Sequence, residues 1–192
     1  MSGRPRGFDA QETVEVVRDL FWEQGFESTS LAQISRVSGL HKPSLYGAFG
    51  DRTDLFLAAL EAYLATSREQ VGAALSQERL RDAVTAFLDT DLAVFTPGHR
   101  GCFLLCVAMP AVDADPRVRD AALSAMDALD RSIRGRVLRA DASELPPGIS
   151  RELTSDLWRA VHVDLALAAR RGEPTEVSRR RVQRFIRLFR AS

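Results

Sequence analysis

Residues 29–49 contain two short helical patterns joined by a tight turn, and this arrangement limits the possible folds more than any other stretch. The turn lies at Ser38-Gly39, where a left-handed glycine would end the first helix. Pro43 suits the first turn of the second helix, because the N–H that it lacks is not needed there. The apolar residues that repeat at helical spacing on either side are Leu31, Ile34, Leu45 and Phe49. The pattern predicts a helix-turn-helix motif.

The second helix of this motif carries polar side chains near its start. Lys42, Ser44 and Tyr46 give it the hydrogen-bond donors, and its length gives it the size, to enter the major groove of DNA. A plain helical hairpin without any DNA role would show the same turn. The turn alone therefore leaves both interpretations open.

The same stretch resembles the DNA-binding domain of the tetracycline-repressor (TetR) family over about residues 8–60. The matching positions are Thr29, Ile34, Gly39, Leu45, Tyr46, Phe49 and Arg52, and the fit continues through Leu55 and Phe56. Four positions depart from the family pattern, namely Ser35, Ser38, His41 and Pro43. His41 replaces a serine and caps a helix less well, which leaves it available to face DNA.

The resemblance implies an all-α protein of about nine helices. Residues 1–50 would form an N-terminal arm and a three-helix DNA-binding domain, and residues 51–192 a helical effector-binding and dimerisation domain. The implied function is a homodimeric transcriptional regulator, most simply a repressor, that a small hydrophobic or aromatic effector releases from a palindromic operator. The residues expected at the double-stranded DNA are Arg4, Arg6, Thr29, Gln33, His41, Lys42, Ser44, Tyr46 and Arg52.

Helical periodicity continues through the rest of the chain. Asp51 and Asp54 open a helix that should run to about Val71, and Ser150 should cap a later one. The segment Gly101–Met109 is apolar enough for a buried strand, but no second strand is evident to pair with it, so a buried helix is expected. A final helix is expected over about Thr175–Arg190. Asp164 takes the place of a small glycine in relatives, so we expect it either to pair with an arginine of the facing subunit or to lie at the rim of the helix crossing.

Charge and hydropathy narrow the protein class. The 192 residues carry no net charge, and residues 1–52 hold six cations against seven acids, so we expect modest non-specific affinity for DNA. No apolar run approaches the roughly 20 residues that span a bilayer, and the N-terminus lacks a signal-peptide core. We therefore expect a cytoplasmic protein without a membrane partner.

Aromatic and methionine side chains in the second domain could line an effector pocket or simply form its core. The candidates are Phe87, Phe95, Phe103, Met109, Met126, Trp158 and His162. Side chains of these types at helical spacing are more often core residues than ligand contacts. The sequence leaves both roles open.

Cys102 and Cys106 are the only cysteines and lie four residues apart. They lack the further Cys or His that a zinc site needs, so neither a metal nor another cofactor is expected. Inert buried thiols are one interpretation. A redox or electrophile trigger is another, in which His99 and Arg100 would lower a thiol pKa. The histidines are scattered and no catalytic constellation can be assembled, so we do not expect an enzyme. A helical small-molecule or protein-binding module without DNA regulation stays open as an alternative.

Overall fold

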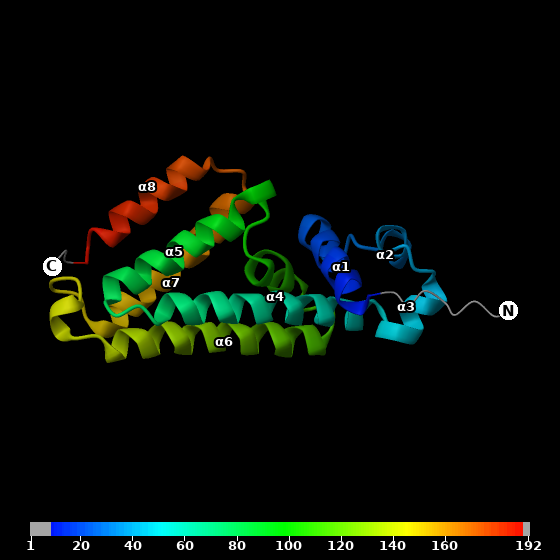
Figure 1. The fold of residues 1–192 in the computed structure, drawn as a ribbon, viewed down its shortest axis with the longest axis horizontal. Helices are drawn as coiled ribbons and strands as arrows, with labels where there is room; N and C mark the ends of the chain where they lie inside the picture. The colour runs from blue at the N-terminus through cyan, green and yellow to red at the C-terminus, as the bar shows by residue number, and fades with distance from the viewer. Residues whose placement is uncertain (1–8, 190–192) are drawn as a thin grey trace. The chain divides into compact units, whose positions relative to one another are not determined.

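The computed structural model describes residues 9–189. Within them every regular element is a helix, the helices are joined by loops, and there are no strands (Figure 1). This confirms the predicted all-α class. The α-helices are α1 (Ala10–Gln24), α2 (Leu31–Ser38), α3 (Lys42–Phe49), α4 (Arg52–Leu75), α5 (Leu80–Phe95), α6 (Pro116–Arg139), α7 (Arg151–Arg170) and α8 (Thr175–Ile186). Shorter helical segments are η1 (Pro97–His99), η2 (Leu104–Ala108), η3 (Met109–Ala111) and η4 (Ala142–Glu144).

The chain divides into two compact units, residues 1–63 and 64–192. The division falls inside α4, so this helix begins in the first unit and ends in the second. The sequence-based boundary after residue 50 instead precedes α4. It separates the helix-turn-helix from the remainder, whereas the compact first unit also includes the first half of α4.

The first unit has an aromatic core. The ring of Phe56 on α4 meets Phe21 on α1 at 5.0 Å and Phe26 after α1 at 4.8 Å, both edge to face. Such pairs add about 0.5–1.5 kcal/mol beyond the area that they bury. Trp22 and Tyr63 form a further edge pair at 5.1 Å. The start of α4 is thereby packed onto α1.

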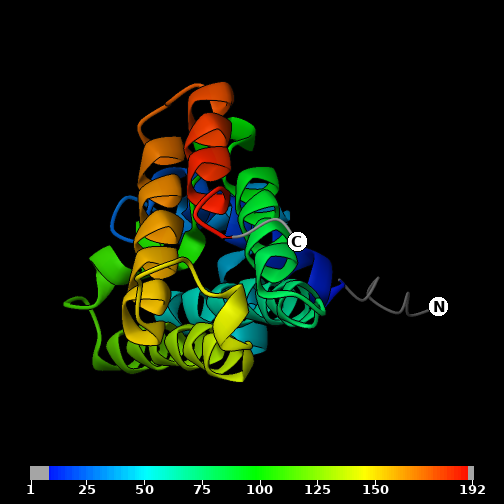
Figure 2. The same ribbon diagram turned by 90° about the vertical axis from the view of Figure 1, so that its left-hand side faces the viewer.

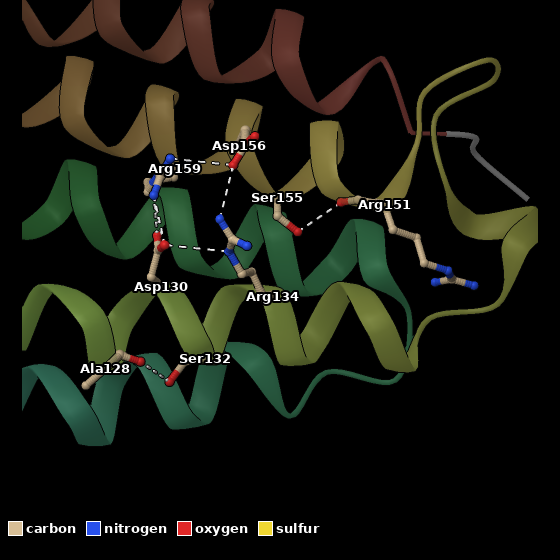
Figure 3. Close-up of polar contacts among 8 residues, drawn as sticks. All are labelled: Ala128, Asp130, Ser132, Arg134, Arg151, Ser155, Asp156 and Arg159. Atoms are coloured by element: carbon tan, nitrogen blue, oxygen red, sulfur yellow. Dashed lines mark hydrogen bonds and ion pairs between the residues drawn. The ribbon is translucent and has the colours of Figure 1, made fainter.

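The second unit is built around α7, which packs against α5, α6 and α8. Figures 1 and 2 show α8 running beside α5 and α7, in agreement with their contacts. An ion-pair network also joins α6 to α7 (Figure 3). In it, one Arg159 nitrogen lies 2.8 Å from the Asp130 carboxylate, and Arg134 lies 3.6 Å from Asp130 and 3.7 Å from Asp156.

The segment predicted as a buried helix over Gly101–Met109 is helical but not an α-helix. It forms the π-helical turn η2 and then the 3₁₀ turn η3, and the Met109 N–H donates to the carbonyl of Leu104, five residues earlier. Gly101, which precedes this segment, has φ of +66°. A Cβ there would come 2.6 Å from the carbonyl oxygen of Ala166 on α7 and 2.8 Å from the Cys106 sulfur. Single π-helical turns of this kind occur frequently at functional sites.

Two helix ends differ from the prediction. The α4 helix continues beyond Val71 to Leu75, and α8 ends at Ile186 instead of running to about Arg190. After Ile186 the chain tightens, and Leu188 and Phe189 donate N–H bonds three residues back, to Phe185 and Ile186. Helix ends often tighten in this way, and sequence patterns locate them poorly.

Among the described helices, none is by itself long and apolar enough to span a membrane. Only Leu80–Phe95 and Pro97–Ala111 taken together meet the length and composition criterion, and they are bent by 73°.

Candidate nucleic-acid interface and buried polar cluster

The turn of the helix-turn-helix is held by side-chain hydroxyls. Gly39 has φ of +68°, the left-handed conformation predicted for it. The Ser35 hydroxyl donates to the Leu40 carbonyl at 2.6 Å, and the Ser38 hydroxyl donates to the Ile34 carbonyl at 2.8 Å. The two serines that depart from the family pattern therefore stabilise the turn, which the sequence analysis did not recognise. Local hydroxyl bonds of this type are a common way to end a helix.

Helix α3 has one buried anchor and an exposed polar face. Leu45 is fully buried. His41, Lys42, Ser44 and Tyr46 are all exposed, Tyr46 by 50%. His41 occupies the N-cap position without a side-chain cap bond, and Pro43 lies in the first turn as predicted. Among residues 9–189 these four side chains have no hydrogen-bond or ion-pair partner, so their polar groups are available to an external partner.

Gln33 is already engaged in a local network. Its side-chain oxygen accepts from the Ser30 N–H at 2.8 Å, while the Ser30 hydroxyl accepts from the Gln33 N–H, which completes a capping box. The Gln33 amide nitrogen donates to Gln24 at 2.7 Å. Gln33 is half-buried, so it can contribute to DNA contact only by giving up some of these bonds.

Thr29 and Arg52 point inward. Thr29 is fully buried, and its hydroxyl donates to the Gly25 carbonyl at 2.7 Å. Arg52 donates to the carbonyls of Phe26 and Thr29. Thr29 is thus enclosed, whereas the Arg52 side chain is 30% exposed, and its contact to DNA stays a prediction. The other two predicted contacts, Arg4 and Arg6, lie outside the described residues.

The second unit contains a buried charged pair. Asp91 of α5 and Nδ1 of His162 on α7 are 2.8 Å apart, with side chains 9% and 7% exposed. Burial raises the pKa of Asp91, although His162 opposes this. Burial alone would lower the pKa of His162, but the charge of Asp91 and the hydrogen bond to it prevail and raise that pKa to about 10. The pair therefore holds its proton firmly at neutral pH.

Four of the predicted effector-lining residues meet at this pair. The His162 ring lies 5.5 Å from that of Phe87 and 5.6 Å from that of Phe95, and Phe87 lies 5.3 Å from Trp158. The Trp158 indole Nε1 is buried without a hydrogen-bond partner in the part of the chain described. Of the remaining candidates, Phe103 is buried, and Met109 and Met126 are half-buried.

Asp91 was missed by the sequence analysis. It stands within an otherwise apolar series on α5 that includes Phe87, Leu88, Leu92 and Phe95. A single acid inside such a series is a signal, because a buried carboxylate needs a partner. His162 was identified, but only as a possible pocket residue.

The cysteines lie against α7. The Cys106 thiol contacts the Ala166 carbonyl at 3.7 Å, and burial raises the pKa of Cys106. The nearby cation that partly offsets this shift is Arg170. At Cys106 the shift is opposite to the lowered thiol pKa that the redox interpretation needs. Cys102 is buried next to His162, whose pKa it helps to raise.

Asp164 pairs within its own chain. Nη1 of Arg181 on α8 lies 2.9 Å from Asp164 and 2.9 Å from Glu173, and the Ser178 hydroxyl also donates to Glu173. The partner is therefore Arg181 of the same chain, whereas the sequence analysis considered only an arginine of a facing subunit or a position at the rim. Among residues 9–189 no group of three His, Cys, Asp or Glu side chains could hold a metal ion.

The exposed polar face of α3, on a helix that follows a left-handed glycine turn, is the arrangement found in helix-turn-helix DNA-binding regulators. Residues 14–59 match the sequence model of a protein family described as "Bacterial regulatory proteins, tetR family". A structure of a cysteine mutant of the TetR family transcriptional regulator CifR, complexed with 26bp double-strand operator DNA, is 30% identical. It aligns with a TM-score of 0.84 over 98% of this chain and all of that one.

Two repressors of Escherichia coli (strain K12) are also similar to this chain. The HTH-type transcriptional repressor BdcR is 26% identical over 175 residues, and the HTH-type transcriptional repressor ComR is 26% identical over 183 residues. Each match covers 91% of this chain and 85% of that protein. The chain belongs to the TetR family of transcriptional regulators. It is a DNA-binding transcriptional regulator and not an enzyme.

Proposed function

We propose that this regulator is a homodimeric repressor that binds a palindromic operator and is released by a small hydrophobic or aromatic effector. The observation that carries the proposal is the outward polar face of α3, where Lys42, Ser44 and Tyr46 surround the single buried anchor Leu45. Lysine and tyrosine in the first turns of such a helix can reach phosphates and base edges. The operator-bound structure of CifR and the repressors BdcR and ComR support the same assignment.

Dimerisation is supported by exposed leucine side chains on α7 and just after α8. Leu153 and Leu167 of α7 are 48% and 42% exposed, and Leu188, after α8, is 42% exposed. A two-fold pairing that covers these leucines is the common arrangement for soluble oligomers. It would present two copies of α3, which accounts for a palindromic site.

The effector would bind at the Asp91–His162 pair. The rings of Phe87 and Phe95 provide an apolar wall, and the unpartnered Trp158 N–H offers one donor. A few placed polar groups among aromatic side chains are typical of small-molecule sites. Because α4 runs from the first unit into the second, a change in the second unit can shift the equilibrium of the first.

The test begins with selection of bound duplexes from random DNA, followed by gel shifts with single variants. Lys42→Ala should lower affinity for every duplex and reduce the salt slope by about one, as the loss of a phosphate contact does. Tyr46→Ala should weaken the selected operator by about 1–3 kcal/mol. Arg131→Ala, at an exposed position of α6, is the matched control and should bind normally. Unchanged operator affinity in both α3 variants would contradict the proposal.

A thiol trigger is the second candidate, and the position of Cys102 beside the buried Asp91–His162 pair favours it. N-ethylmaleimide is a suitable probe, since the sulfur adds to one alkene carbon and a proton to the other. Release of DNA after this treatment in the native protein, but not in Cys102→Ser, would support the thiol trigger. Equal operator binding before and after complete alkylation of Cys102 would eliminate it.

A further inference from the structure

We infer that Arg52 is a positioning residue, one that fastens the first turn of α4 to the loop before α2 and so sets how the helix-turn-helix meets DNA. Nη1 of Arg52 donates to the carbonyls of Phe26 and Thr29, at 3.1 Å each. The guanidinium carbon lies 4.2 Å from the centre of the Phe26 ring, and Nη2 lies 4.0 Å from Glu27. The side chain is 30% exposed, with these contacts directed inward.

The loop that Arg52 holds delivers the start of α2. Gly25 ends α1 with φ of +83°, and the buried Thr29 bonds back to the Gly25 and Phe26 carbonyls. Ser30 follows immediately and caps α2. The contacts of Arg52 to Phe26 and Thr29 therefore fix the point from which α2, the turn and α3 follow.

The same use of arginine recurs twice in the second unit. Nη2 of Arg136, itself buried, donates to the carbonyls of Gln77 and Glu78 at 3.1 and 3.0 Å. Nη1 of Arg151 donates to Val137 and Ala140 at 2.7 and 2.8 Å. Each of the three arginines bridges two carbonyls in or beside the end of a helix. Backbone carbonyls at such ends need partners from outside the helix.

An ordinary phosphate contact does not account for this geometry. To reach a phosphate, Nη1 would have to give up both of these bonds. The Phe26 carbonyl would keep its bond from the Thr29 N–H, so the cost falls on the partly buried Thr29 carbonyl, and losing the partner of such a group is costly. Both bonds come from the single nitrogen Nη1, so a lysine ammonium could donate to the same two carbonyls. A lysine could not also lay a planar guanidinium over the Phe26 ring. Position 52 therefore requires the shape of arginine as well as its charge.

The experiment compares Arg52→Lys and Arg52→Met with Lys42→Ala on the selected operator duplex across a range of salt concentrations. We expect both Arg52 variants to lose about ten-fold or more in affinity with an unchanged salt slope, since no phosphate contact is removed. Amide hydrogen exchange in residues 25–30 should speed up in both. Lys42→Ala should instead lower the slope by about one and leave that exchange unchanged.

Two results would overturn the assignment. One is near-normal affinity in Arg52→Lys together with a reduced slope in Arg52→Met, which is the signature of a phosphate contact. The other is normal affinity in both variants. Should Arg52→Met fail to fold, Arg52→Lys still decides, because the two roles predict opposite affinities for the variant that keeps the charge.

Discussion

The two units of the molecule place their polar side chains in opposite ways. In the first, the polar groups of α3 face outward, and only Leu45 anchors the helix inside. In the second, an acid and a histidine are enclosed together among aromatic rings, at 9% and 7% exposure. The exposed side chains of α3 can bind a charged partner directly from water. The enclosed Asp91–His162 pair can be affected only by a ligand that enters the core or by a change in core packing. Substitutions of the exposed α3 side chains should therefore affect binding, and substitutions of the enclosed pair should affect folding.

The largest expected effect is in the enclosed set. Asp91→Ala should destabilise the second unit by about 3–5 kcal/mol, because it leaves His162 buried without its partner. Chemical denaturation followed by Trp158 fluorescence in a Trp22→Phe background would measure this. Lys42→Ala is the matched variant in the exposed set and should change stability by less than about 0.5 kcal/mol. Equal losses in both variants would break the contrast between the units.

The next largest effect should be a loss of stability of the second unit at alkaline pH. His162 has a pKa raised to about 10, so its contribution is fully present below its ordinary value near 6.5 and is lost as pH rises through about 10. The second unit should therefore lose stability between pH 7 and 10. His162→Gln should show a much flatter profile over that range, measured by melting at each pH. A wild-type profile as flat as that of His162→Gln would contradict the pKa assignment.

Two neighbours on α3 sharpen the comparison within one helix. Leu45→Ala removes the fully buried anchor and should cost about 2–5 kcal/mol, with loss of DNA binding through disorder of α3. Tyr46→Ala, at a side chain that is half exposed, should leave folding nearly intact. Hydrogen exchange of the α3 amides distinguishes them. Protected α3 amides in Leu45→Ala would show that α3 is held by something other than its core contact.

Helix caps provide an intermediate effect. Ser30→Ala should cost about 1 kcal/mol by removing the capping box of α2, and Ser150→Ala should cost a similar amount at α7. His41→Ala should cost little, since His41 makes no cap bond. Replacement by serine, His41→Ser, should even stabilise α3 while reducing operator affinity if the imidazole faces DNA. Thermal unfolding and gel shifts on the same samples test both parts.

The smallest effect is expected at the surface network of α6 and α7 (Figure 3). Arg134 is 54% exposed and lies 3.6–3.7 Å from its partners, so Arg134→Ala should cost about 0–0.5 kcal/mol. Arg159→Ala should cost somewhat more, because one Arg159 nitrogen contacts both oxygens of Asp130 at 2.8 and 2.9 Å. Added salt should reduce both differences in denaturation experiments. Losses as large as that of Asp91→Ala would contradict the view that only enclosed charges are critical.

Local features were predictable from the sequence because they depend on neighbouring residues. The left-handed Gly39, the first-turn position of Pro43 and the cap at Ser150 are all found. Asp51 and Asp54 even cap reciprocally, each side chain accepting from the other's N–H at 2.8 Å. Turn and cap chemistry operates over three or four residues, which a sequence displays directly.

Contacts between distant residues could not be predicted in the same way. Asp91 meets His162 across 71 positions, and Arg52 reaches carbonyls 23 and 26 positions away. Gly101 comes close to Ala166, which belongs to another helix, and no local pattern reveals this approach. Periodicity identifies the buried face of each helix but does not specify which faces meet. The resemblance suggested DNA contacts for Thr29 and Arg52, but it could not show that Thr29 bonds to the Gly25 carbonyl or that Arg52 bonds to the Phe26 and Thr29 carbonyls.

Lys42 has one more consequence, which follows from its isolation. It is the single lysine in 192 residues, and it stands exposed at the first position of α3. The chain therefore has one side-chain primary amine, and an acylating reagent or a fluorescent active ester has that one ε-amino target besides the α-amino terminus. A dye could thus be attached to α3, the helix that we propose to contact DNA, without any mutation. Bound DNA should shield the Lys42 amine from modification. A slower acylation rate in the presence of DNA would therefore report that α3 is covered.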